Sequence, residues 1–520
     1  MGNIEGFMLQ SFQQLFDSGY SEAGASTVKR SLKGFNAPSS SPNEDINYNQ
    51  QTLRQRGRML YMSSPVAASA INTNRAKVIG TGLKLQSTID YAQLGMTPEE
   101  AEKWQRVTEK EFSIWAEKRQ NVDAIGLSDF YDLQQIVTMS WLASGDVFVL
   151  FQRQAATPIN PYSLRLRLVE ADRIRTPLAP GSNNFITDGE NPDNRNKIFD
   201  GVEVDANGRV VAYHICNMYP RQLKSLDGIE WRRVSAFGRK SGLPNVLHVM
   251  SAERPDQYRG VTYLAPVIES LLNISRYTQS ELMAALVQSF FTAWIQTNTD
   301  PGRIPINEVG YGDGEGYDNP PDSDLSKNEN EYEMGPGTIT HLQPGEEIKF
   351  GNPNIPTEGF DAFFKVICRE IGAALDIPYD TLLKEFNASY SASRAALMEA
   401  WEGFRQRRRI IVSKFCQPVY EAWLAEAVAI GRIKAPGFFL DPFIRAAWSR
   451  AQWQGPVQGQ LDPIKEVNAN ILAVQHGFKT HSQVTMEMGT GDWLANVETL
   501  KQETEAIRAA YPVADGEGQQ

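Results

Sequence analysis

The chain has 520 residues, of which 41% are hydrophobic and 22% charged, as is typical of globular protein with several subdomains. A formal net charge of −11 argues against a generally basic nucleic-acid-binding surface, although a protein that handles DNA without adhering to it remains compatible. Three widely spaced cysteines, no signal-peptide pattern and no apolar run of membrane-spanning length predict a soluble intracellular protein with buried thiols.

The N-terminal half is predicted to form an α+β domain, with helices followed by antiparallel strands. Residues 1–45 are rich in Ser, Gly and Asn, which predicts a flexible arm. N-cap signals at Thr97 and Ser128-Asp129 predict helices over 98–118 and 129–143. A further helical pattern covers 48–76, and β-type runs lie at 147–151, 164–170, 198–204, 210–215 and 246–250.

Basic residues in and just after the 48–76 helical pattern are open to two interpretations. A basic stripe can contact nucleic acid, but basic side chains on a helix more commonly form a solvated face. We therefore predict that the following side chains point into solvent: Arg54, Arg56, Arg58, Arg75 and Lys77.

The centre of the chain is predicted to form a rod with a head at its tip. Apolar residues recur at helical spacing over 262–296. At about 1.5 Å rise per residue, this helix would reach roughly 50 Å. An acidic insert rich in Gly and Pro follows at 301–336. The chain is then predicted to return as a helix over 360–375, to cross a polar loop at 384–393 and to enter a long helix near Arg394.

The C-terminal region continues this helical pattern. Pro418 removes one backbone donor and predicts a bend near Lys414. Asp462 and Pro463 mark the start of a last pair of helices, and residues 511–520 are predicted to be a disordered tail.

Motifs for enzymatic chemistry are absent from the sequence. There is no P-loop, no G-x-S-x-G elbow and no H-E-x-x-H, and the five histidines are scattered. A glycine-rich run at 310–316 neither follows a clear strand nor opens a helix, which argues against a phosphate loop. The carboxylates of the acidic insert do not have calcium-loop spacing, so we predict a solvated loop and no catalytic residue, metal site or cofactor.

Basic residues beyond the insert fall into two groups. The run 405–409 holds four arginines at successive helical positions, which point in several directions, and some of them are predicted to pair with acidic neighbours between subunits. Lys365, Arg369 and Lys384 are sparser. Few, spaced cations suit the lining of a channel, because each well-held phosphate contact tightens binding and would stall sliding DNA.

Short motifs in a consistent order extend over most of the chain, from about residue 48 to 505. Each is weak alone, but in this order they resemble the lambda-like family of tailed-phage portal proteins. The motifs are Val78-Ile-Gly-Thr-Gly-Leu83, Gly145-Asp-Val-Phe-Val149, Val169-Glu-Ala-Asp-Arg173, Gly201-Val-Glu-Val-Asp-Ala-Asn-Gly-Arg209, Ala212-Tyr-His-Ile215, Arg259-Gly-Val-Thr-Tyr-Leu-Ala-Pro-Val267, Leu342-Gln-Pro-Gly-Glu346, Asn387-Ala-Ser-Tyr-Ser-Ala-Ser-Arg394, Asp462-Pro-Ile-Lys-Glu466 and Gly477-Phe-Lys-Thr480.

The resemblance implies an α+β portal fold with a wing, a two-helix stem, a clip and a helical crown, assembled into a ring with an axial channel. The implied boundaries are a flexible arm at 1–45, the wing at 46–258, the first stem helix at 259–296, the clip at 297–352, the second stem helix at 353–382, the tunnel loop at 383–393, a long wing and crown helix at 394–431, a C-terminal wing and crown region at 432–510 and a tail at 511–520.

The implied function is that of a portal rather than an enzyme. About twelve copies would form a cyclic ring at one capsid vertex of the virion, assembled in the host cytoplasm, through which double-stranded DNA passes without sequence specificity. The implied partners are terminase, head-completion or connector proteins, and the major capsid and scaffolding proteins, with no membrane. The alternatives are a metal-dependent hydrolase using the insert carboxylates and a non-ring scaffolding or interaction protein.

The resemblance also assigns candidate residues to three regions. The tunnel loop would offer DNA one cation and short polar groups. The candidates are Lys384, Asn387, Ser389 and Tyr390 in the tunnel loop, Lys365 and Arg369 in the stem, and Glu308, Asp313, Glu315, Asp318, Asp322 and Asp324 in the partner-docking clip.

Overall fold

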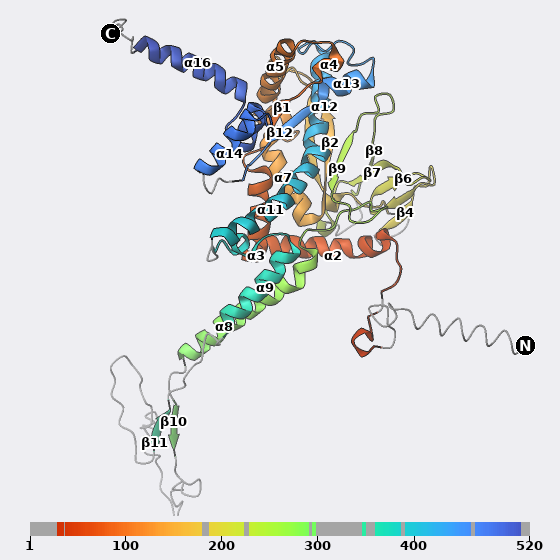
Figure 1. Cartoon of the computed structure of the whole chain (residues 1–520). Coiled ribbons are helices and arrows are strands. Elements are labelled where there is room, and N and C mark those ends of the chain that lie inside the picture. Colours follow the sequence, from red (N-terminus) through yellow and green to blue (C-terminus); the bar gives the residue numbers. More distant parts are fainter. Residues whose placement is uncertain are drawn as a thin grey trace, which may run out of the picture. The chain divides into compact units, whose positions relative to one another are not determined.

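The protein is a mixture of helices and antiparallel sheets, which form two compact units (Figure 1). The computed structural model describes residues 29–35, 37–178, 187–222, 228–290, 294–297, 346–349, 359–385, 390–458 and 463–510. The first unit takes in the described residues up to Tyr61, Ile71–Ala265 and those from Trp401 onward. The second unit combines Met62–Ala70 with Pro266–Ala400.

Local capping signals correctly predict two helices of the N-terminal half. Helix α5 (Pro98–Ala116) begins at a capping box in which Thr97 and Glu100 exchange side-chain and backbone hydrogen bonds. The Asp129 carboxylate caps α7 (Phe130–Ser144). The 48–76 pattern corresponds to two helices, α2 (Pro42–Ser63) and α3 (Pro65–Asn74), followed by a π-helical turn at Arg75–Ile79. Short helices α4 (Tyr91–Leu94) and α6 (Arg119–Val122) complete this part.

Two antiparallel sheets form most of the strand region. In the three-stranded sheet, β2 (Asp146–Arg153) lies between β3 (Leu164–Glu170) and β9 (Val246–Met250), and all three strands were predicted from the sequence. The second sheet has the order β4-β5-β6-β7-β8. Its strands are β4 (Asp188–Glu190), β5 (Lys197–Phe199), β6 (Val202–Val204), β7 (Val210–Cys216) and β8 (Trp231–Ser235).

The prediction of one strand over 198–204 is wrong, because these residues form the β5–β6 hairpin. Asp200 and Gly201 turn the chain at positive φ, 42° and 85°. A Cβ on Gly201 would lie 2.4 Å from the backbone nitrogen of Arg175, so the turn needs glycine at this position. A tight turn over 205–208 joins β6 to β7.

An aromatic core joins distant parts of the first unit. Phe112 of α5 packs edge-to-face against Phe130 of α7 and Trp423 of α12 (Gln417–Ala429), with ring centroids 5.6 and 5.1 Å apart. Strand β1 (Lys84–Ser87) pairs with β12 (Ala451–Gln454), which follows α13 (Pro442–Ser449). The core therefore depends on contacts between the N-terminal and C-terminal thirds of the chain.

The long helix after residue 390 is interrupted where the sequence predicts a bend. Helix α11 (Tyr390–Ile411) continues through a π-helical turn at Val412–Cys416 into α12. Pro418 lies in the first turn of α12, where its missing N–H is tolerated. All three cysteines are buried, as predicted.

The second unit contains a pair of packed helices, α8 (Ile268–Phe290) and α9 (Phe360–Ala374), which lie side by side in Figure 1. Tyr277 of α8 stacks on Phe360 and meets Phe363 edge-on, with centroids 5.5 and 5.1 Å apart. The predicted helix over 262–296 is too long at both ends. Pro266 precedes its first turn, and β10 (Trp294–Thr297) pairs with β11 (Glu346–Lys349) across the insert.

The predicted polar loop at 384–393 is shorter in the structure, because α11 already begins at Tyr390. Helix α10 (Tyr379–Leu383) precedes it. The predicted last pair of helices is instead three: α14 (Pro463–Gln475), α15 (His481–Met488) and α16 (Trp493–Ala510). None of the helices in the described part of the chain combines the length and apolar character that a membrane crossing requires.

Candidate channel-lining site

The α9–α10 connection is a tight turn that positions the predicted stem and tunnel residues. Gly372 permits the turn, because a Cβ there would lie 2.6 Å from the carbonyl oxygen of Ile377. The Ile377 N–H donates to the Gly372 carbonyl at 2.9 Å, and Asp376 adopts a left-handed conformation with φ 49°. Ile377 and Leu382 are buried beneath the turn. The turn therefore holds α10 against the end of α9.

Lys365 of α9 is neutralised by carboxylates. Its Nζ donates to Asp361 Oδ2 at 2.7 Å and lies 3.7 Å from Glu385 Oε1. The hydrogen bond to Asp361 raises the pKa of Lys365 above its ordinary value. The Tyr379 hydroxyl donates to Glu385 Oε2 at 3.0 Å. Burial and this bond raise the pKa of Tyr379. Lys365 is thus part of a local ion pair rather than a free cation.

Arg369 and Lys384 present their charges differently. The Arg369 guanidinium lies 5.3 Å from the Tyr379 ring centroid, so the structure brings Lys365 and Arg369 together around Tyr379 and Glu385. Lys384 is exposed at the end of α10 in a left-handed conformation, φ 59°. Within the described residues no carboxylate forms an ion pair with Lys384.

The remaining sequence candidates are only partly described. Tyr390 is the first residue of α11. Outside the described residues lie Asn387 and Ser389 of the tunnel loop and Glu308, Asp313, Glu315, Asp318, Asp322 and Asp324 of the insert.

Sequence reasoning missed a buried ion network in the first unit, centred on Arg259. Its Nε and Nη2 donate to the two Asp146 oxygens at 2.7 and 3.2 Å, and its Nη1 donates to Asp200 Oδ2 at 2.6 Å. Further bonds reach the carbonyls of Ala171 and Ile174, each at 3.0 Å. Burial alone would raise the pKa of Asp146, but the Arg259 charge, the hydrogen bonds from His248 and Arg259 and the Arg54 charge together hold that pKa well below its usual range.

Two cations of α2 extend this network, which corrects the prediction of a solvated helix face. Arg54 is buried and donates to Asp172 Oδ1 at 3.2 Å and to the Ser144 carbonyl at 3.3 Å. Arg58 forms ion pairs with Asp172 and with Glu170. The prediction failed because these carboxylates approach α2 from the strand region, more than a hundred residues away in sequence.

The other three predicted solvent-facing cations behave differently. Arg56 is exposed, as predicted. Arg75 and Lys77 are half-buried: Arg75 Nη1 lies 3.7 Å from the Met139 sulfur, and Lys77 Nζ lies 6.0 Å from the Trp401 ring centroid. The four arginines at 405–409 include Arg408, which donates to three backbone carbonyls of its own chain, so it is not available to another subunit.

Backbone contacts reinforce the Arg259 network. The Gly260 N–H donates to Asp146 Oδ2 at 3.1 Å, and Gln50 Nε2 of α2 donates to the Gly260 carbonyl at 2.8 Å. A Cβ on Gly260 would lie 2.0 Å from the carbonyl oxygen of Gly145, which itself has φ 94°. Two glycines are therefore required where these segments cross.

A second buried carboxylate, Glu203, organises the five-stranded sheet. It accepts hydrogen bonds from the three asparagines of the 191–196 loop at 2.7–3.1 Å and from Arg233 Nε at 2.7 Å. Burial opposes ionisation, but these donors hold the pKa of Glu203 well below its usual range. His214 contacts the same carboxylate at 2.9 Å, yet burial keeps its pKa lowered. Glu203 thus pins a loop and is not positioned to react.

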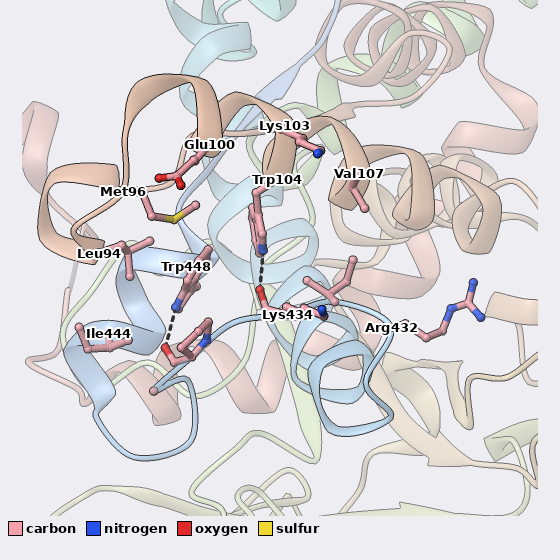
Figure 2. A pocket seen from close by; sticks show the side chains of 13 residues that line it. Leu94, Met96, Glu100, Lys103, Trp104, Val107, Arg432, Lys434, Ile444 and Trp448 are labelled. Atoms are coloured by element: carbon pink, nitrogen blue, oxygen red, sulfur yellow. Dashed lines mark hydrogen bonds between the residues drawn. The ribbon is translucent and has the colours of Figure 1, made fainter.

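A groove of about 820 Å³ lies in the first unit between α5 and the segment leading into α13 (Figure 2). Trp104 and Trp448 both line the groove and pack against each other, with ring centroids 4.7 Å apart. Their indole N–H groups donate to the carbonyls of Lys434 and Pro436 at 2.8 and 3.2 Å. The walls are mainly apolar, and no group of metal-ligating side chains occurs among the described residues.

A family model for phage portal proteins of the lambda family matches residues 28–408. The chain belongs to the lambda family of phage portal proteins. Members of this family are structural components of the virion rather than enzymes. This membership disfavours the hydrolase alternative, which would have used carboxylates of the insert.

Known relatives of this portal protein are distant in sequence. The chain is 22% identical to the portal protein of Escherichia phage N15, with 88% of this chain and 85% of the relative covered. It is 22% identical to portal protein B of Escherichia phage lambda, with 91% and 87% covered. A chain of the virion of a native gene transfer agent particle aligns with a TM-score of 0.42 at 14% identity, covering 85% of this chain and 94% of that one.

The motifs that carry the family resemblance meet in the buried network of this portal protein. Residues from four of these motifs contact one another or share partners. They are Gly145 and Asp146, Asp172, Gly201, and Arg259 and Gly260. Their role is therefore to hold α2, the three-stranded sheet, the β5–β6 turn and the segment before α8 together.

Proposed function

We propose that about twelve copies of this protein form a ring at one vertex of a phage capsid, through which double-stranded DNA enters during packaging and leaves during ejection. The observation that carries this proposal is the family match over residues 28–408. The net charge of −11 on each copy supports it, since a negative channel wall repels DNA and leaves it free to slide.

Exposed apolar side chains on the α8–α9 pair support the ring. On a single chain these side chains are between 39% and 62% exposed, on two helices that already pack against each other. Large apolar side chains gathered on an exposed helix pair are expected at an interface. The side chains are Leu272, Leu282 and Met283 of α8 and Phe363 and Val366 of α9.

The mass and shape of the purified protein test the ring. Light scattering should give a particle of about twelve subunits, and negative-stain images should show a central hole. A monomer or dimer that stays so in the presence of scaffolding protein would favour the alternative of a non-ring interaction protein.

The proposal divides the chain by the boundaries that the resemblance implies. The wing would cover 46–258, with 394–431 and 432–510 completing the wing and crown. The stem would consist of 259–296 and 353–382, with the clip at 297–352 between them and the tunnel loop at 383–393. The α8–α9 pair falls within the two stem segments and β10–β11 within 294–349, which is consistent with a stem whose tip carries the clip.

Within this ring, Lys384 is the cation best suited to contact DNA. It is exposed and no described carboxylate pairs with it, whereas Lys365 is held by Asp361 and Glu385. One such cation from each subunit would give a few weak phosphate contacts around the channel, which guide DNA without stalling it.

Replacing Lys384 with Ala is expected to change the amount of DNA packaged per particle by about two- to tenfold, because each lost phosphate contact weakens the interaction by a modest factor. Ring assembly should be unchanged, since the side chain is exposed and no carboxylate of the described residues pairs with it. The measurement is encapsidated DNA in a packaging reaction, with Lys384→Arg as the charge-preserving control. Equal packaging by all three proteins would count against the contact.

We further propose that the acidic clip docks terminase during packaging and head-completion or connector proteins afterwards. The ring would assemble with major capsid and scaffolding proteins in the host cytoplasm. A partner with a basic face suits the carboxylates of residues 308–324.

Binding of terminase to this portal protein is therefore expected to weaken as salt rises, by about tenfold or more between low and physiological ionic strength. A charge-neutralised variant, Asp313→Asn with Glu315→Gln and Asp318→Asn, should bind more weakly and show a smaller salt dependence. Affinity that does not respond to salt in the unsubstituted protein would contradict electrostatic docking.

A further inference from the structure

Helix α16 carries an apolar seam that the described residues of its own chain leave uncovered. Its four seam residues follow one another at spacings of three, four and three residues, which is the a/d pattern of a coiled coil. They are Val497, Leu500, Thr504 and Ile507. Val497, Leu500 and Ile507 are 40%, 61% and 60% exposed. In the same register, Trp493 occupies the preceding d position and stacks on His481 of α15, with centroids 4.2 Å apart.

The opposite side of α16 already has a partner within the chain. Glu498, at a b position of this register, forms an ion pair with Arg106 of α5 at 2.6 Å. Arg106 therefore contacts the outer side of α16 and leaves the seam side free, so the seam is available to another molecule.

Charges beside the seam indicate what that molecule is. In this register Glu503 is a g position and Arg508 is the following e position, five residues later. In a parallel pair of identical helices, these two positions face each other across the seam, g on one helix to e on its partner. Within the described residues neither side chain has an ion-pair partner in its own chain. Opposite charges at g and e favour a parallel pair of copies. In an antiparallel pair, g would face g and e would face e, which would bring like charges together.

We propose that α16 pairs in parallel with α16 of a neighbouring copy, through Val497, Leu500, Thr504 and Ile507, with Glu503 of each helix facing Arg508 of the other. This inference rests on the proposed ring. Two heptads are too short to pair in free solution, but subunits already held in one ring meet at a high effective concentration. Each seam pairs with one identical seam, so the copies are joined two by two at α16. The α16 helices of the ring therefore have half the rotational symmetry of the rest of the ring.

Cysteine cross-linking tests the pairing in the full-length ring. All three native cysteines are buried, so an introduced cysteine is the reactive one. Leu500→Cys should give covalent dimers under mild oxidation, because a d position meets the same d position of its partner. Gln502→Cys, at the outward-facing f position, is the matched control and should give roughly tenfold less dimer.

Charge exchange provides a second readout. In the Leu500→Cys background, Glu503→Lys should lower the dimer yield by placing like charges across the seam, and adding Arg508→Glu should restore it. The ring mass should stay that of a single ring throughout. Intact rings without the Leu500 cross-link, equal cross-linking at Gln502, or no rescue by the double exchange would overturn the pairing. Loss of rings in the unsubstituted protein would instead count against the proposed function.

Discussion

Replacing Arg259 with Met is expected to lower the free energy of unfolding by about 3–5 kcal/mol, because the change leaves a buried carboxylate without its main partner. Asp146 is fully buried and loses two hydrogen bonds, at 2.7 and 3.2 Å. The contact with His248 at 3.4 Å and the Gly260 N–H at 3.1 Å remain and compensate only in part. Arg259→Lys should give an intermediate loss, since an ammonium group cannot bond both oxygens in the same plane.

A surface ion pair supplies the matched control for Arg259. Arg254 pairs with Asp45, and both side chains are more than 40% exposed. Arg254→Met is expected to cost less than about 1 kcal/mol. Denaturant-induced unfolding of the three proteins, followed by fluorescence, measures the difference. If Arg254→Met and Arg259→Met lower the free energy of unfolding by similar amounts, the buried network does not stabilise the fold more than a surface ion pair does.

Replacing Leu282 with Asp is expected to abolish the ring while leaving the single chain folded. Leu282 is 62% exposed on α8, so its change costs the isolated chain little. In the proposed ring this side chain is buried against a neighbouring subunit, where burying a leucine contributes about 1.5–3 kcal/mol and a charge is unfavourable. The penalty recurs at every subunit interface, so ring closure should fail cooperatively. Val366→Asp on α9, at 57% exposure, should behave in the same way.

The control for Leu282→Asp lies two residues away on the same helix. Ser280 is exposed on the polar side of α8, about 160° around the helix from Leu282 by the 100° turn per residue. Ser280→Asp adds the same charge and should still form rings. Light scattering reports the assembly state, and thermal unfolding reports the fold. Normal rings from both Leu282→Asp and Val366→Asp would remove the apolar helix faces from the subunit interface.

Local sequence signals predicted those parts of the fold that depend on neighbouring residues. The Thr97 and Asp129 caps specify the starts of α5 and α7, because each side chain satisfies a backbone N–H three residues ahead. Pro418 marks the interruption before α12 for a similarly local reason. The strand prediction over 198–204 passed over a signal that is also local, since Asp200-Gly201 is a two-residue hairpin turn with both φ angles positive.

The candidate site divides in the same way. Sparse spacing in the sequence identified three candidate cations, Lys365, Arg369 and Lys384. Only the three-dimensional contacts distinguish the neutralised Lys365 from the exposed Lys384. Spacing along a helix does not reveal the distance to Glu385, which reaches Lys365 through the α9–α10 turn.

The sequence by itself determined the family, the order of the elements and the local starts of helices, because motif order and capping are linear properties of the chain. Only the tertiary structure decided what the motif residues do. Arg259 and Asp146 are 113 positions apart and become partners only after the chain has folded. Arg54 likewise became a buried network residue instead of a solvated one, since a cation is buried only where folding brings carboxylates to it.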